Sequence, residues 1–288
     1  MDLGPGRKLP KLTFGLLLAA VLPLNCVLSA ALEFSAELGG RYESNASNSN
    51  LASDRLADGF FTAHLQAGTS GVWGRDWRWH AYLAGEGEQA FRFTGLSQIE
   101  GGVRLGVDKK FGLGWKAPRL QIDFYTAYRG SGQDGASGAR LSPSVGFVWQ
   151  FVERGGVSLR YLPQWFFAEG AVFYSGGQEG RVSGWFDAFA ATRLFLDYSV
   201  RYGDVVSYAT PPRPDLAAIA EVKEPTDVFG AERMVYRFDA WTQSVRAGFE
   251  QNLTSWMKLR MAYRFEFTHR GSLNYANQIG EIGLRFKF

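Results

Sequence analysis

The chain ends on the sequence IGEIGLRFKF, residues 279–288. Within it, apolar side chains recur at every second position, at Ile282, Leu284, Phe286 and Phe288. A period of two is the repeat of a β-strand, because successive side chains of a strand point to opposite faces. The end of the chain therefore predicts a strand with one apolar face and one polar face.

The same alternation returns along the chain from residue 33 onward. In one segment, for example, the apolar residues Phe61, Ala63 and Leu65 alternate with Thr62 and His64. Segments of this kind are close to the ~9–11 residues with which a tilted strand crosses a bilayer. Twelve are present, at residues 33–43, 61–67, 77–86, 99–107, 120–128, 145–151, 157–167, 182–190, 194–202, 236–249, 257–267 and 279–288.

The connections between these segments alternate in length. Short connections are expected at residues 72–76, 109–117, 153–156, 191–192 and 252–255. Long polar connections are expected at residues 44–58, 89–95, 131–140, 169–180, 203–233 and 269–277. Tight turns at one end and long loops at the other are typical of a transmembrane β-barrel. We therefore expect an all-β protein, an up-and-down antiparallel transmembrane β-barrel of about twelve strands, with both termini at the turn end.

A soluble β-sandwich is the alternative, since alternation also fits a sheet with one wet face. Two features favour the barrel. The segments are longer than the ~5–6 residues typical of soluble strands. Aromatic residues such as Trp77, Tyr128, Trp149 and Tyr202 also stand near segment ends, where rings with one apolar and one wet side suit the interfaces of a bilayer.

The N-terminus has the pattern of a secretory signal. A basic stretch at residues 7–11 precedes an apolar run at residues 12–28 and the small residues 29–31. This order is that of a signal peptide with its cleavage site. We expect residues 1–31 to be removed and residues 32–288 to form the barrel. An uncleaved anchor is the alternative, which Pro23 in the apolar run disfavours.

Composition excludes several other classes of protein. The 31 basic and 28 acidic residues nearly balance, whereas a nucleic-acid-binding protein would show a clear basic excess. The 23 Phe, 12 Tyr and 9 Trp residues supply more buriable surface than a disordered chain carries. Cys26, the only cysteine, lies in the expected signal peptide, so the mature barrel would contain neither a disulfide nor a cysteine metal site.

The last residues of the chain resemble the ending of bacterial outer-membrane β-barrel proteins, of which the porins are one kind. In that class the final strand ends in an aromatic residue, usually Phe, with apolar residues at alternate positions before it. The resemblance implies residence in the outer membrane of a Gram-negative bacterium, surrounded by outer-membrane lipid. It also implies that the barrel-assembly machinery is a partner and that Phe286 and Phe288 form the assembly signal.

If the apolar stripe faces lipid, the polar stripe faces the barrel lumen. Closure makes the last strand a neighbour of the first, so basic residues of the last two strands and the first strand are expected to collect on one wall. This basic wall consists of Arg41, Lys258, Arg260, Arg264, Arg285 and Lys287. Such a wall favours anions in pores. It can equally form a structural ion-pair network with Glu37, Glu266 and Glu281.

Three lumenal aromatic residues, Trp185, Phe189 and Phe195, are expected either to constrict the pore or simply to pack the lumen. The long connection at residues 203–233 contains an apolar run at residues 216–222, which predicts a short helix in a lid, plug, partner-binding arm or plain surface loop. Near Ser244 the apolar positions change parity, which predicts a β-bulge.

Enzymatic function has little support in the sequence. His269 and Ser272 weakly resemble the His and Ser of barrel phospholipases, but a spacing of three puts them on opposite faces of a strand. His64 and His80 lack a clear third metal ligand. We therefore expect no catalytic residues, no metal and no cofactor.

The pattern as a whole predicts an outer-membrane, porin-like channel through which small polar or anionic solutes diffuse. The alternative is a non-conducting structural or assembly barrel that docks with an envelope protein or secretion complex. An outer-membrane enzyme of the lipase type is third. No nucleic-acid partner is expected.

Overall fold

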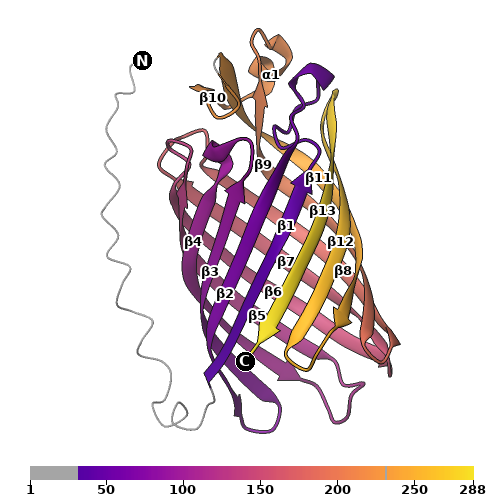
Figure 1. Cartoon of the computed structure of the whole chain (residues 1–288). Coiled ribbons are helices and arrows are strands. Elements are labelled where there is room, and N and C mark those ends of the chain that lie inside the picture. Colours follow the sequence, from indigo (N-terminus) through magenta and orange to yellow (C-terminus); the bar gives the residue numbers. More distant parts are fainter. Residues whose placement is uncertain (1–31, 231) are drawn as a thin grey trace, which may run out of the picture. The chain divides into compact units, whose positions relative to one another are not determined.

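The computed structural model describes residues 32–230 and 232–288. The expected signal peptide, residues 1–31, lies outside the described residues. Thirteen strands form one antiparallel sheet, and twelve of them close into a barrel (Figure 1). The barrel strands are β1 (Leu32–Glu43), β2 (Asp58–Trp73), β3 (Trp77–Ala90), β4 (Gln98–Lys110), β5 (Arg119–Ser131), β6 (Gly138–Val152), β7 (Gly155–Ala168), β8 (Ser175–Phe189), β9 (Thr192–Ala209), β11 (Arg233–Asn252), β12 (Met257–Arg270) and β13 (Leu273–Lys287).

The barrel closes between its first and last strands. β1 pairs with β13 from Ser35 opposite Lys287 to Glu43 opposite Ile279. β9 pairs with β11, and each other barrel strand pairs with its neighbours in sequence. The predicted up-and-down antiparallel barrel of twelve strands is therefore confirmed, and each predicted segment corresponds to one strand.

The outer face of the barrel is apolar. Leu38, Leu65 and Leu83 are 45%, 50% and 67% exposed, which is the exposure expected of side chains that face lipid rather than a protein core. Aromatic side chains stand on this face near both ends of the strands. They include Trp73, Trp77, Trp149 and Trp256 at one end and Tyr128, Trp165, Tyr202 and Trp241 at the other.

The two ends of the barrel differ in their connections. Most of the short connections lie at the end that carries the C-terminus, which we call the turn end, although the connection from β4 to β5 there covers residues 111–118. The opposite loop end carries the longest connections, those between β1 and β2 and between β9 and β11 (Figure 1). The predicted long connection at residues 269–277 is wrong, because β12 and β13 form a tight hairpin. Only Gly271 and Ser272 separate these strands, and Gly271 adopts a φ of 57°, which glycine tolerates in a two-residue turn.

A folded cap takes the place of much of the predicted loop at residues 203–233. β9 and β11 remain paired beyond the barrel wall up to Ala209 and Met234. The short strand β10 (Val222–Thr226) adds to β11, and helix α1 (Pro214–Ile219) supplies the predicted short helix (Figure 1). Among the described residues, no helix is long and apolar enough to span a membrane.

The cap has an apolar core on both faces of the β9–β11 extension. Phe238 and Leu216 are fully buried on one face with Tyr275 of β13. Tyr208 and Val235 are buried on the other face, against residues of the connections β1–β2, β3–β4, β5–β6 and β7–β8. Because these connections come from all sides of the barrel, their common core covers the loop end.

The cap also explains the change of parity near Ser244. β11 keeps an unbroken register with both neighbours there, so the predicted bulge is wrong. The same face of β11 is apolar at Phe238 and Ala240, where it packs inside the cap, and polar at Thr242 and Arg246, where it lines the lumen. The hydrophobic pattern changes because the surroundings change along a regular strand.

Candidate functional site: the charged lumen

The six residues of the predicted basic wall lie on the inner face of three adjacent strands, β12, β13 and β1. The register places Lys258 opposite Arg285 and Arg285 opposite Glu37, so these side chains share one face. Arg260, Arg285 and Lys287 line one lumenal cavity, and the remaining members of the wall lie along the same strands.

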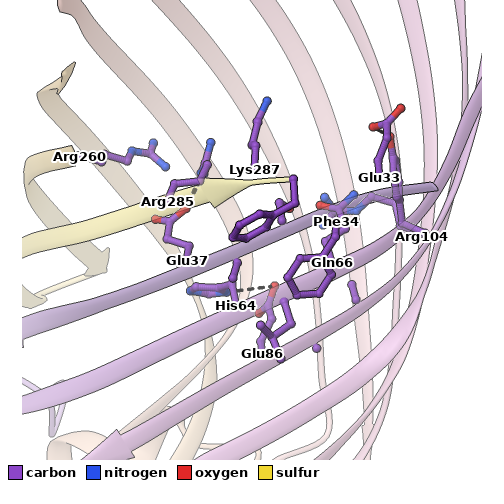
Figure 2. Close-up of a pocket in the computed structure, with 17 residues that line it drawn as sticks. Glu33, Phe34, Glu37, His64, Gln66, Glu86, Arg104, Arg260, Arg285 and Lys287 are labelled. Carbon is purple, nitrogen blue, oxygen red and sulfur yellow. Dashed lines mark hydrogen bonds and ion pairs between the residues drawn. The ribbon is translucent and has the colours of Figure 1, made fainter. Parts of the chain in front are cut away.

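This cavity occupies the turn end of the lumen and has a volume of about 570 Å³. We call it the lower cavity. Both basic and acidic side chains line it, as Figure 2 shows. Its charged lining residues are Glu33, Glu37, Glu86, Arg104, Arg260, Arg285 and Lys287, together with His64.

Carboxylates neutralise most of the basic wall. Arg41 lies 2.7 Å from Glu88, and Arg285 lies 2.6 Å from Glu37, both as nitrogen to oxygen distances. The other ion pairs of the wall are Arg41–Glu43 at 2.9 Å, Arg264–Glu266 at 3.2 Å, Arg264–Glu281 at 3.4 Å and Arg260–Glu250 at 3.7 Å. Within the described residues, Lys258 and Lys287 have no carboxylate within 4.0 Å.

A second lumenal cavity, of about 360 Å³, lies under the cap. We call it the upper cavity. Glu281 lies between two arginines here, since Arg246 and Arg264 both form ion pairs with its carboxylate. Tyr275 lines the same cavity and also belongs to the core of the cap. The upper cavity therefore contacts the cap directly.

The three predicted lumenal aromatics do not lie together. Trp185 and Phe195 are directly opposite each other on β8 and β9, and Arg260 lies 5.1 Å from the centre of the Phe195 ring. Phe189 lies elsewhere, because a register shift after Asp187 pairs it with Thr192 at the turn and leaves it 73% exposed. A bulge of this kind changes which face a side chain occupies. The prediction that Phe189 lies in the lumen assumed regular alternation and is therefore wrong.

A buried ion pair ties the cap to the connection between β1 and β2. Arg213, just before α1, lies 3.2 Å from Asp54, and both side chains are about 5% exposed or less. Arg213 also donates two hydrogen bonds to Asp215. This arginine lowers the pKa of Asp215 to about 2, chiefly through those hydrogen bonds. We call Asp54, Arg213 and Asp215 the cap latch.

The residues considered for catalysis or metal binding are separated. His64 lies 3.7 Å from Glu86, whereas His80 lies 3.0 Å from Asp123. His269 stacks on Phe267, and Ser272 lies in the β12–β13 turn. Within residues 32–230 and 232–288, no three His, Cys, Asp or Glu side chains are grouped as metal ligands.

Sequence reasoning missed several lumenal cations, among them Lys110 and Arg119. Both fell in or beside an expected short connection, but β4 and β5 continue to these residues. With Arg78 they line a further cavity of about 310 Å³ at the turn end of the barrel. Continuing the alternation beyond Asp108 would have placed Lys110 on the lumenal face.

The comparisons with known proteins agree with this architecture. No protein-family model and no curated protein matches the chain. An outer membrane channel from Pseudomonas putida F1 is similar in structure, with a TM-score of 0.61 and 11% identity over 93% of this chain and 100% of that chain. The NanC porin gives a TM-score of 0.48 and 11% identity over 88% of this chain and 100% of that one. The chain has the fold of outer-membrane β-barrel channels.

Proposed function

We propose that the protein is an outer-membrane channel through which small polar or anionic solutes diffuse. The observation that carries this proposal is a charged lumen, with cavities of about 570 and 360 Å³, inside a closed barrel whose outer face is apolar. An apolar exterior requires a surrounding bilayer, and a polar interior of this kind provides a path for hydrated solutes. The proposed location is the outer membrane of a Gram-negative bacterium.

The expected preference for anions comes from lumenal cations that have no carboxylate partner among the described residues. In the lower cavity, Arg104 and Lys287 have no carboxylate of the described residues within 4.0 Å. Glu37 is paired with Arg285, Glu33 accepts hydrogen bonds from Ser70 and Tyr82, and Glu86 lies 3.7 Å from His64. Unpaired cations in a narrow polar lumen attract anionic solutes.

The cap restricts the path of solutes through the barrel. Its core covers the loop end, so solutes that enter from outside must pass when the cap loosens or through gaps around it. We therefore propose a channel whose conductance depends on the cap. The same packed cap favours the second candidate, a non-conducting barrel that presents the cap to an envelope partner.

We do not propose an enzyme. Two residues, His269 and Ser272, suggested a lipase. His269 lies on β12 and Ser272 lies in the turn that follows it. Within the described residues, no side-chain hydrogen bond joins them. His269 instead stacks against Phe267.

Biogenesis follows from the same proposal. Residues 1–31 direct export and are then cleaved. N-terminal sequencing of the protein purified from membranes tests this, and we expect the sequence to begin at Leu32. The barrel-assembly machinery then recognises the last strand. The backbone of Phe288 exchanges hydrogen bonds with Phe34 of β1, so the terminal residue takes part in closing the barrel.

Swelling of proteoliposomes tests the channel. Liposomes containing the purified protein are diluted into isotonic solutions of a small carboxylate, a small sugar or a small amine, and empty liposomes provide the control. We expect the fastest swelling in the carboxylate and the slowest in the amine. Swelling no faster than that of empty liposomes, for the parent and for a variant with a loosened cap, would support the docking barrel instead.

A further inference from the structure

The cavity of about 310 Å³ at the turn end lies on the wall formed by β2 to β6, away from the predicted basic wall. We call it the turn-end cavity. Four cations line it, Arg75, Arg78, Lys110 and Arg119, with two carboxylates, Asp76 and Asp108. Four positive charges against two negative charges leave an excess of two positive charges in its lining.

Two of these cations are directly opposite each other. The register of β4 and β5 pairs Lys110 with Arg119. Side chains that are directly opposite on one face of an antiparallel pair have Cβ atoms about 4.5–5.5 Å apart, and like charges there are destabilising. A negative charge between these two residues would offset their repulsion.

Three other pairs of cations face each other across the described strands, and the protein supplies a partner to each. Glu281 pairs with both members of Arg246–Arg264. Glu37 pairs with Arg285 of Lys258–Arg285. In the third pair, Arg160 donates to Gln121 and Arg181 donates to Glu179.

The pair Lys110–Arg119 has no such partner within the described part of the chain. Neither side chain has a carboxylate within 4.0 Å or a side-chain hydrogen bond, although Asp76 and Asp108 line the same cavity. Glu281 lies between Arg246 and Arg264, but no described carboxylate lies in this way between Lys110 and Arg119. An anion from solution can occupy the position between them.

We propose that the turn-end cavity binds a soluble dianion that carries a phosphate group. A doubly charged phosphate matches the excess of two positive charges. The guanidinium groups of Arg78 and Arg119 can each hold two phosphate oxygens, and the ammonium group of Lys110 supplies a compact third charge. The register places these three side chains on the lumenal face, so the ligand comes from the lumen.

This inference rests on the proposed channel and makes its solute class more specific. A phosphate site at the turn end of the path concentrates phosphate-bearing anions where the lumen opens. Screening by salt restricts the attraction to about 8 Å at physiological ionic strength. The site therefore acts on anions that have already entered this end of the lumen.

Isothermal titration calorimetry tests the site directly, with inorganic phosphate as the probe and the full-length barrel in detergent. We expect the parent to bind phosphate and the variant K110Q/R119Q to bind it roughly tenfold more weakly or worse, because each charge-assisted hydrogen bond contributes strongly. The control is K109Q/K116Q, which removes the same charge. Lys109 contacts Trp77 and Lys116 contacts Trp115, and neither lysine lines the cavity.

The outcomes separate this inference from the proposed function, since binding is measured without transport. Absence of phosphate binding by the parent, or equal affinity in the parent and K110Q/R119Q, would overturn the site whatever the conductance. Binding by a barrel that conducts nothing would refute the channel alone. In nanodiscs containing phosphatidylglycerol, phosphate binding is expected to persist. Its loss there would show that a lipid headgroup holds the site and would overturn a soluble ligand.

Discussion

Arg285 of β13 pairs with Glu37 of β1 across the seam that closes the barrel, with 2.6 Å between Nη2 and Oε2. The pair links the last strand to the first. It also neutralises a residue that sequence reasoning assigned to anion attraction. Arg285 therefore belongs both to the basic wall, which is expected to attract anions, and to an ion-pair network that neutralises it. The ion preference of the channel measures which of these effects is larger.

Removing Glu37 and removing Arg285 should shift the ion preference in opposite directions. Glu37→Gln leaves Arg285 without its carboxylate and is expected to increase the preference for anions. Arg285→Gln leaves Glu37 unpaired in the lumen and is expected to reduce that preference. The reversal potential in a salt gradient measures both shifts. Identical values for the parent and both variants would show that this pair does not contribute to selectivity.

Arg213→Ala should loosen the cap and raise conductance. It removes the closer of the two arginines that pair with the buried Asp54 and leaves only Arg233, at 3.9 Å, among the described residues. Breaking a buried ion pair typically costs about 3–5 kcal/mol. Hydrogen exchange of the backbone of α1, compared between variant and parent, checks the loosening. Arg55→Ala, an exposed arginine in the same connection, is the control. Unchanged exchange in α1 would contradict the latch.

Acid should also loosen the cap latch. The pKa of Asp215 is lowered from 3.8 to about 2, so the ionised form is the one that folding favours. Its contribution is present above the ordinary pKa of 3.8 and is lost as the pH falls through about 2. We expect the protection of the α1 amides, measured relative to the intrinsic exchange rate at each pH, to fall between these pH values. The fall in protection should be smaller in Asp215→Asn, and an equal fall in both proteins would argue against this carboxylate.

A charge on the outer face should be far more harmful than the same charge one residue away. Leu65 is 50% exposed on the outer face of β2, whereas Gln66 lines the lower cavity. Leu65→Arg is expected to destabilise the barrel by about 2–4 kcal/mol if it lies near the bilayer midplane, and Gln66→Arg much less. Unfolding by urea in lipid vesicles measures both values. Equal losses would contradict the lipid-facing assignment.

The terminal residue should matter for assembly beyond its contacts. The ring centres of Phe288 and Phe34 lie 5.8 Å apart, and Phe267 is an aromatic residue near the end of another strand. Deleting Phe288 is expected to lower the amount of protein in the outer membrane much more than Phe267→Ala. Immunoblots of outer-membrane fractions compare the two variants. Similar amounts would make Phe288 an ordinary strand-end aromatic.

The barrel could be predicted from the sequence because strand alternation is a local signal. Leu65 and Gln66 already show by their chemistry which face meets lipid. The cap could not be predicted in the same way, because its strands depend on distant partners. Phe238 looks like a lipid-facing residue in sequence, but Leu216 and Tyr275 bury it inside the cap.

The composition of the lumen was predictable, but its charge pairing was not. Alternation places Arg264 and Glu281 on the lumenal face. Only the register between strands shows that Glu281 pairs with both Arg246 and Arg264. Lys110 and Arg119 escaped prediction because strand ends are the least certain part of a sequence-based assignment.

Conductance of the purified protein in a planar bilayer distinguishes a channel from a docking barrel. The recording uses the parent and Arg213→Ala, each in symmetric salt and then in a salt gradient. We expect discrete current steps, larger or more frequent in Arg213→Ala, with a reversal potential on the anion-selective side. A silent bilayer for both proteins, although both are folded and inserted, would contradict the channel.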